Sequence, residues 1–170
     1  MTTVTRHPAT VLRVVRAIED GATLDPDSEL VAAYGGRDAL LLDLHGHWSR
    51  QLLSRIDVAL ELGADTPVAS VAVAWRSALR DQPGVHRLLE AEAGNPVLRS
   101  ARRSMFASVG VAAGRATFDD PVSISAPIGE RLLASVTTDA DAPRRPSRLS
   151  RALRRIWDGG PDPDPFPWAA

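Results

Sequence analysis

The alternation of apolar and polar positions predicts a series of amphipathic helices separated by turns that contain Gly or Pro. The longest of these helices spans about residues 37–62. At about 100° per residue its side chains divide into an apolar face and an opposite polar face. The apolar face holds Leu41, Leu44, Trp48, Leu52, Ile56 and Ala59, and the polar face holds Asp43, Arg50, Ser54, Asp57 and Glu61. Such a helix packs on one side and meets water on the other.

Turn residues set the bounds of the helices on either side. Two helices are predicted before the long one, from Pro8 to Gly21 and from Asp25-Pro26 to Gly35. Three more are predicted to begin at Thr66-Pro67, after Gln82-Pro83-Gly84 and at Asn95-Pro96, and the last of them ends near Gly114. A proline at the first helical position needs no hydrogen-bond donor, so a cap residue followed by proline is a typical helix start.

Two of these later helices also have a predicted inner face. In the helix that begins at Pro67, the inner residues are Val68, Val71, Trp75 and Leu79, while Ser70, Ser77 and Asp81 lie on the outer face. In the helix that begins at Pro96, the inner residues are Leu98, Ala101, Met105 and Val109. Gly110 and Gly114 form a small-xxx-small pattern, which predicts close helix packing or a helix end.

The last third of the chain is less regular. We predict a loop over residues 117–125, with a turn at Asp120-Pro121, and a seventh helix from Pro127 through Ala134. The predicted fold is therefore all-α, a bundle of about seven helices in residues 1–135. A polar linker (136–146), a basic amphipathic helix (147–158) and an extended proline-rich tail (159–170) are predicted to follow it.

Composition excludes several kinds of chemistry. The chain of 170 residues has no cysteine, which excludes disulfides and thiolate metal sites and agrees with a reducing, cytoplasmic location. All 20 basic residues are arginine, so no lysine is present for a Schiff base or for binding phosphate. Aromatic residues make up only 5%, and the core is therefore predicted to consist largely of Ala, Val and Leu. Neither a signal peptide nor a membrane-spanning segment is predicted.

The sequence contains no recognisable catalytic motif. It has no nucleophile elbow, no zinc-protease histidine pair and no Gly-rich phosphate loop. His45 and His47 are two residues apart, so on a helix they point in nearly opposite directions and cannot share a metal ion. We therefore predict a protein that is not an enzyme, with no cofactor and no metal site.

His45 is the histidine of most interest, because it lies within the apolar stripe of the long helix. A buried histidine needs a partner for at least one ring nitrogen. Two interpretations stay open: a core histidine satisfied by its neighbours, or a group that senses a ligand or pH. His47 is predicted to face solvent, and Gly46 between them to mark a kink or a close helix contact.

Arginines form two basic features on predicted helices. Arg99, Arg102 and Arg103 make a strip that we expect to pair with Glu90 and Glu92, with phosphate binding as the alternative. In the C-terminal helix the apolar side holds Leu149, Ala152, Leu153, Ile156 and Trp157, and the opposite side holds Arg148, Arg151, Arg154 and Arg155.

Three roles are open for this C-terminal helix. It packs on the bundle as an eighth helix, it docks onto a protein partner or an anionic membrane surface, or it contacts a nucleic-acid backbone. The preceding linker favours the second role, a tethered helix that docks onto a protein partner or an anionic membrane surface. Phe166 and Trp168 in the tail would then provide a further short anchor.

The segment from Tyr34 to Leu41 resembles the junction of TetR-type transcriptional regulators, where an aromatic turn, a basic residue, an acid and leucines begin a long helix. The resemblance extends to about Gly114. It implies a homodimer and a ligand pocket lined by the third, fourth and sixth helices, for which we predict His45, Trp48, Trp75 and Met105. The DNA-reading part departs from the family, because one helix is missing and no basic residue lies between Arg16 and Arg37.

These observations favour a non-enzymatic helical regulatory or adaptor protein that binds a protein partner or a surface through its C-terminal helix. The alternative is a shortened TetR-like transcriptional regulator that binds DNA and holds a small molecule.

Overall fold

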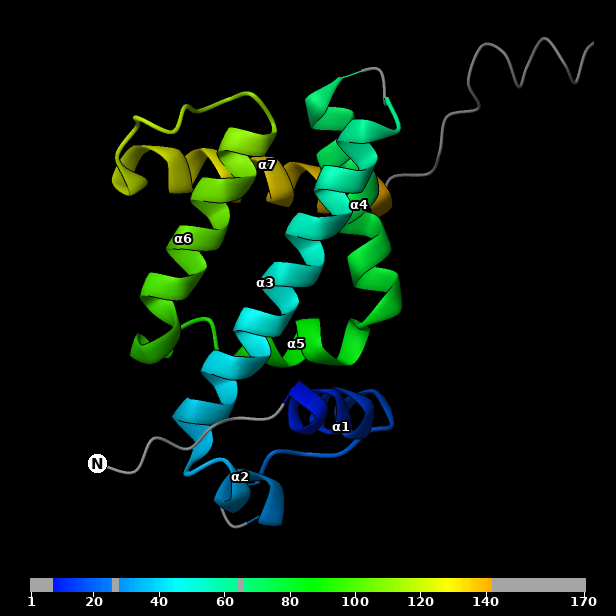
Figure 1. The fold of residues 1–170 in the computed structure, drawn as a ribbon, viewed down its shortest axis with the longest axis vertical. Helices are drawn as coiled ribbons and strands as arrows, with labels where there is room; N and C mark the ends of the chain where they lie inside the picture. The colour runs from blue at the N-terminus through cyan, green and yellow to red at the C-terminus, as the bar shows by residue number, and fades with distance from the viewer. Residues whose placement is uncertain (1–7, 26–27, 64–65, 142–170) are drawn as a thin grey trace, which may run out of the picture. The chain divides into compact units, whose positions relative to one another are not determined.

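A computed structural model describes residues 8–25, 28–63 and 66–141, and this part of the chain is all-helical, as predicted (Figure 1). Its helices are α1 (Pro8–Glu19), α2 (Glu29–Ala33), α3 (Arg37–Glu61), α4 (Pro67–Asp81), α5 (Pro83–Ala91), α6 (Pro96–Ala112) and α7 (Val122–Asp141). Residues 1–139 form one compact unit and residues 140–170 another. The predicted docking helix 147–158, the tail and residues 142–146 of the predicted linker lie outside the described residues.

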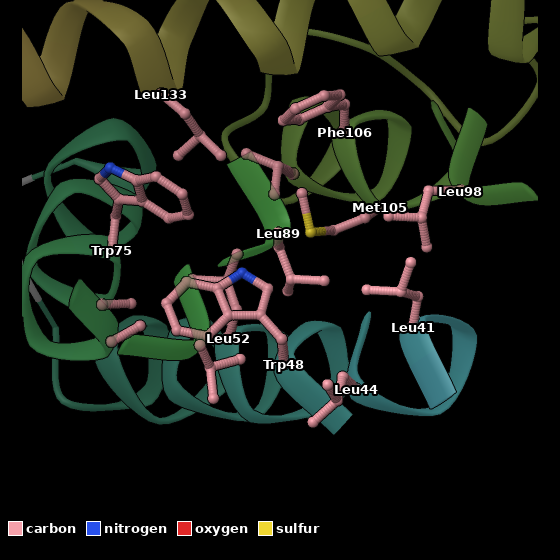
Figure 2. Packing of buried hydrophobic residues seen from close by; sticks show 14 of the residues in the cluster. Leu41, Leu44, Trp48, Leu52, Trp75, Leu89, Leu98, Met105, Phe106 and Leu133 are labelled. Carbon is pink, nitrogen blue, oxygen red and sulfur yellow. The ribbon is translucent and has the colours of Figure 1, made fainter. Parts of the chain in front are cut away.

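The long helix α3 is the central element of the first unit. It lies beside both α4 and α6, and it also contacts α1, α2 and α5 (Figure 1). The predicted apolar face is the buried one, since Leu41, Leu44, Leu52 and Ile56 are fully inaccessible. Figure 2 shows Leu41, Leu44 and Leu52 of α3 packed beneath Leu89, Leu98 and Met105 of the neighbouring helices.

Two helix starts follow the predicted cap-then-proline pattern, whereas the start predicted at Asp25-Pro26 is wrong, because α2 begins at Glu29 and is capped by the Ser28 side chain. The Thr66 hydroxyl accepts the backbone N–H of Ala69, and the Asn95 side chain accepts that of Val97, directly before α4 and α6. Each accepted bond satisfies one of the N–H groups that a helix start leaves unpaired. These two starts are therefore confirmed.

The start of α5 is capped by another helix. The Glu19 carboxylate at the end of α1 accepts the backbone N–H groups of Gly84 and Val85, each at 2.9 Å. A Cβ atom at Gly84 would lie 3.0 Å from that carboxylate, so the bare glycine makes this approach possible. A negative charge at a helix N-terminus is favourable, and here it joins α1 to α5.

The prediction for residues 117–146 was partly wrong. Helix α7 begins at Val122 rather than Pro127, and it runs to Asp141, so residues 136–141 of the predicted linker are helical. The Pro121 carbonyl accepts the N–H groups of Ile124 and Ser125, which makes Asp120-Pro121 the helix start rather than an isolated turn. Pro127 lies on the exposed side of the helix.

Helices α6 and α7 cross at two glycines. A Cβ atom at Gly129 of α7 would lie only 1.9 Å from the Phe106 carbonyl oxygen and 3.0 Å from the Gly110 nitrogen. A Cβ atom at Gly110 would in turn lie 2.9 Å from the Ser125 carbonyl oxygen. The close packing predicted at Gly110 is thus present, and its partner is α7.

Two polar residues predicted on outer faces are buried. Ser70 is 1% exposed, because its hydroxyl donates to the Ala59 carbonyl of α3 at 3.2 Å and allows α4 to pack closely there. His47 is 9% exposed, and its Nε2 lies 3.4 Å from Gln82 Nε2. At Gly46, by contrast, the only atom that a Cβ would approach is the side chain of Arg50 on the same helix, so no other helix makes a close contact there.

The segment that carries the family resemblance has structural roles here. Gly35 and Gly36 adopt positive φ angles of 77° and 124° and turn the chain from α2 into α3. Arg37 then donates to the Leu24 carbonyl and to Glu92 Oε1 at 2.7 Å. This arginine therefore ties the start of α3 to the loop before α2 and to the end of α5.

Candidate functional site

A groove of about 380 Å³ opens between α4, α5, α6 and α7. Helix α4 contributes Trp75, α5 contributes only polar or charged side chains, and α6 and α7 each contribute both polar and apolar ones. Its lining is Trp75, His86, Glu90, Arg102, Phe106, Glu130, Leu133, Ala134 and Thr137. The volume lies within the ordinary range of small-molecule sites.

The floor of the groove is aromatic. The rings of Trp48 and Trp75 meet edge to face with centroids 6.0 Å apart, and the His86 ring lies 5.4 Å from the first and 5.3 Å from the second. Figure 2 shows Trp48 rising from α3 and Trp75 extending from α4, with Leu133 of α7 facing Trp75. Ring pairs in this geometry are attractive beyond the area that they bury.

A short hydrogen-bond chain joins α4 to α7 at one side of the groove. The Trp75 indole N–H donates to the Thr137 hydroxyl at 2.9 Å, and this hydroxyl donates to the Leu133 carbonyl at 2.9 Å. The indole, which is 6% exposed, is thus satisfied and held in one orientation.

Arg102 is the partly buried charge of the groove. Its side chain is 14% exposed, and its Nη1 donates to Glu90 Oε1 at 3.0 Å and to the Leu89 carbonyl at 3.4 Å. The guanidinium carbon also lies 5.4 Å from the centre of the Phe106 ring, a distance typical of cation–π contacts. The predicted pair of Arg102 with Glu90 is confirmed, whereas Glu92 pairs with Arg37.

Two histidines beside this arginine have lowered pKa values. For His86, burial lowers the pKa, the Glu90 carboxylate acts in the opposite direction, and the Arg102 charge lowers it further. For His45, burial and then the Arg102 charge lower the pKa to about 4. Burial therefore favours the neutral form of both imidazole rings.

The surroundings of His45 agree with only part of the core-histidine interpretation. The side chain is 2% exposed, and Nδ1 lies 3.3 Å from the Ser49 hydroxyl one turn later. Nε2 is buried and has no hydrogen-bond partner among the described residues. One ring nitrogen is thus satisfied and the other is not.

The four residues predicted for a ligand pocket lie in different places. Trp75 lines the groove and Trp48 supports it from below. His45 and Met105 are buried in the core and do not line it. The helices that line the groove are α4, α5, α6 and α7, so α3 contributes only through Trp48.

Several groove residues were not predicted as site residues. His86 and Glu90, and likewise Arg102 and Phe106, are spaced four residues apart, which places each pair on one helix face. That spacing was a usable signal. Glu130, Leu133 and Thr137 lie on α7, whose extent was predicted wrongly.

Other features of the described residues give less support for a site. A hollow of about 420 Å³ beside α1 contains Arg37, but this arginine is already bonded to Leu24 and Glu92. Within the described ranges, no three acidic or histidine side chains are grouped so as to hold a metal ion. None of the helices between residues 8 and 141 is long and apolar enough to cross a bilayer.

Comparison of the chain with protein-family models, curated proteins and solved structures finds no match in any of the three. The resemblance to TetR-type regulators therefore stays a prediction.

Proposed function

We propose that this is a non-enzymatic helical regulatory protein that binds a small organic ligand in the groove between α4, α5, α6 and α7. The observation that carries the proposal is the partly buried Arg102, which pairs with Glu90 and lies over the Phe106 ring in the groove that Trp75 also lines. An apolar site with a few convergent polar groups is the usual form of a small-molecule pocket.

The same lining supports binding rather than catalysis. The hydroxyl that lines the groove belongs to Thr137, and it is engaged with Trp75 and Leu133. A nucleophile of this type would need a base within hydrogen-bond reach. His86, a candidate base in the lining, contacts the two tryptophan rings instead.

Filling the groove is expected to abolish binding of a small apolar molecule. Ala134 is an exposed residue that lines the groove, so Ala134→Phe places a ring in it without changing any charge. We expect the neutral fluorescent probe N-phenyl-1-naphthylamine to bind the natural chain saturably and the Ala134→Phe variant not at all. The matched control is Ala91→Phe, at an exposed alanine that does not line the groove. Equal probe binding by both variants would show that this groove is not the ligand site.

We further propose that the C-terminal helix predicted over residues 147–158 binds a protein partner and makes the protein an adaptor. The division of residues 147–158 into an apolar side and an arginine side supports this role. If this segment is appended to the bundle, deleting residues 146–170 should leave the midpoint of thermal unfolding within about 2 °C. The same deletion should abolish capture of the partner from the host. A large fall in the unfolding midpoint would instead mean that the segment is part of the core.

The alternative of a shortened DNA-binding regulator has less support. Before α3, the described chain has only α1 and the five-residue α2, and the sequence from Arg16 to Arg37 contains no other basic residue. A DNA-reading element usually carries several basic side chains that contact phosphates. Dimer formation and a cytoplasmic location also stay proposals.

A further inference from the structure

We propose that the groove selects an organic carboxylate, a flat apolar body with one acid group, and that Arg102 binds the acid group through its Nε and Nη2 edge. This inference rests on the proposed ligand-binding function and names the chemical class of the ligand. It is drawn from the bonding of Arg102, the lining of the groove and the balance of charge around it.

Arg102 uses only one nitrogen of its guanidinium group in hydrogen bonds to described residues. A guanidinium group has five N–H donors, and both of the bonds that Arg102 makes to described residues leave from Nη1. Nε and Nη2 thus form an edge with no partner in the described part of the chain, although only 14% of the side chain is exposed. Neither atom is among the buried side-chain atoms that lack a partner, so this edge is open to solvent and to a ligand, and a carboxylate matches its two parallel donors.

Aromatic rings in the lining of the groove favour a flat apolar ligand. Phe106 lies beneath the guanidinium group, and Trp75, which is 6% exposed, lies in the same groove. A planar hydrocarbon body would cover these rings and displace water from them. The volume of about 380 Å³ is sufficient for a ligand with one or two rings.

The charged groups that line the groove are one arginine and two carboxylates, and they differ in burial. Of the two carboxylates in the lining, Glu90 is already paired with Arg102, and Glu130 is exposed, so solvent and salt screen its charge. Arg102 is the most buried of the charged groups, and charges act more strongly where water is excluded.

Three probes with the same ring system and different charge test the inference on the full chain. They are 1-naphthoate, the neutral 1-naphthamide and the cationic 1-naphthylmethylammonium, each titrated by calorimetry at pH 7. We expect 1-naphthoate to bind roughly tenfold or more tightly than the amide, and the ammonium to bind most weakly. The indole N–H signal of Trp75 should shift in the NMR spectrum as 1-naphthoate binds, because this donor lies beside the groove.

Variants of Arg102 and of its neighbour Arg103 test which arginine causes the preference for 1-naphthoate. Arg102→Met should bind 1-naphthoate and 1-naphthamide equally well, and Arg102→Lys, which keeps the charge but lacks the two-donor edge, should fall between this variant and the natural chain. Arg103→Met is the matched control, since Arg103 is exposed and does not line the groove. It should retain the full preference for 1-naphthoate.

Two outcomes would overturn the inference in different ways. Tighter binding of the amide or the ammonium than of 1-naphthoate would show that the groove binds ligands but that Arg102 does not select an acid, and the proposed function would survive. If none of the three probes binds and the Trp75 signal does not move, both the carboxylate assignment and the proposed ligand site are wrong. Because all three probes are first tested on the natural chain, the result does not depend on whether a variant folds.

Discussion

Replacing Gly129 by alanine is expected to destabilise the protein by about 3 kcal/mol or more. The added methyl group would lie 1.9 Å from the Phe106 carbonyl oxygen and 3.0 Å from the Gly110 nitrogen. All of these are backbone atoms of α6, so no side-chain rotation can relieve the overlap. Either α7 moves away from α6 or the two helices separate, and each change opens the contact between Trp75 and Thr137.

The control for this substitution is Gly46→Ala in α3. Gly46 is also inside a helix, but a Cβ atom there would approach only the flexible Arg50 side chain, at 3.3 Å. Alanine is the better helix former, so this variant should be more stable by about 0.5–1 kcal/mol. Urea unfolding followed by circular dichroism measures both variants against the natural chain. If Gly129→Ala unfolds at the same urea concentration as the natural chain, the close crossing of α6 and α7 is incorrect.

Two signals in the sequence were sufficient to place helices of this fold. Helical periodicity predicted α3 and its buried face, because Leu41, Leu44 and Leu52 recur at the period of the helix and are fully buried. The cap-then-proline pattern located α4 and α6 because it expresses a local hydrogen-bond requirement. Both signals act within one or two helical turns.

At Asp120-Pro121 the same pattern is compatible with a turn as well as with a helix start, and the turn predicted there is wrong, because α7 begins at Val122. The sequence offered two possible starts, at Pro121 and at Pro127, and proline is acceptable at the first position of a helix. Local preference could not decide between them. The choice depends on Gly129 and Gly110, which pack α7 against a helix that lies nearly twenty residues earlier.

The sequence also did not predict which polar residues are buried by packing against another helix. His47 and Ser70 lie on the polar sides of their own helices, yet His47 is covered near Gln82, and Ser70 is covered by α3. The groove has the same origin, since Trp75, His86, Arg102 and Thr137 meet only when α4, α5, α6 and α7 are packed together. A helical wheel describes one helix at a time, so it cannot show where side chains of four different helices come together.

The buried His45 is expected to make the stability of the protein fall steeply on mild acidification. Its pKa in the folded protein is about 4, because burial and the Arg102 charge disfavour the protonated ring, whereas the ordinary value is 6.5. Between these values the unfolded chain binds a proton that the folded chain does not. The free energy of unfolding therefore increases as the pH rises from about 4 to 6.5, and it decreases as the pH falls through the same range.

The size of this effect follows from the two pKa values. From pH 7 to pH 5 the difference amounts to about 2 kcal/mol for His45 alone. His47 and His86 have pKa values lowered mainly by burial, so they add to the loss in the same direction. Asp81 and Glu92, whose pKa values are lowered by hydrogen bonds from Arg55 and Arg37, lose their contribution only at lower pH. The window from pH 7 to 5 thus isolates the histidines.

His45→Leu removes the titrating group at nearly constant volume and isolates its share of this loss. At pH 7 the variant should be about as stable as the natural chain, since leucine also removes the buried Nε2 that has no partner among the described residues. At pH 5 it should be more stable than the natural chain by about 2 kcal/mol, as measured by urea unfolding at both pH values. His47→Leu is the control for a less buried histidine and should recover a smaller part of the loss, because His47 is 9% exposed and His45 only 2%. If the natural chain and His45→Leu lose the same free energy from pH 7 to pH 5, the His45 ring is accessible to protons in the folded protein and its burial in the core is wrong.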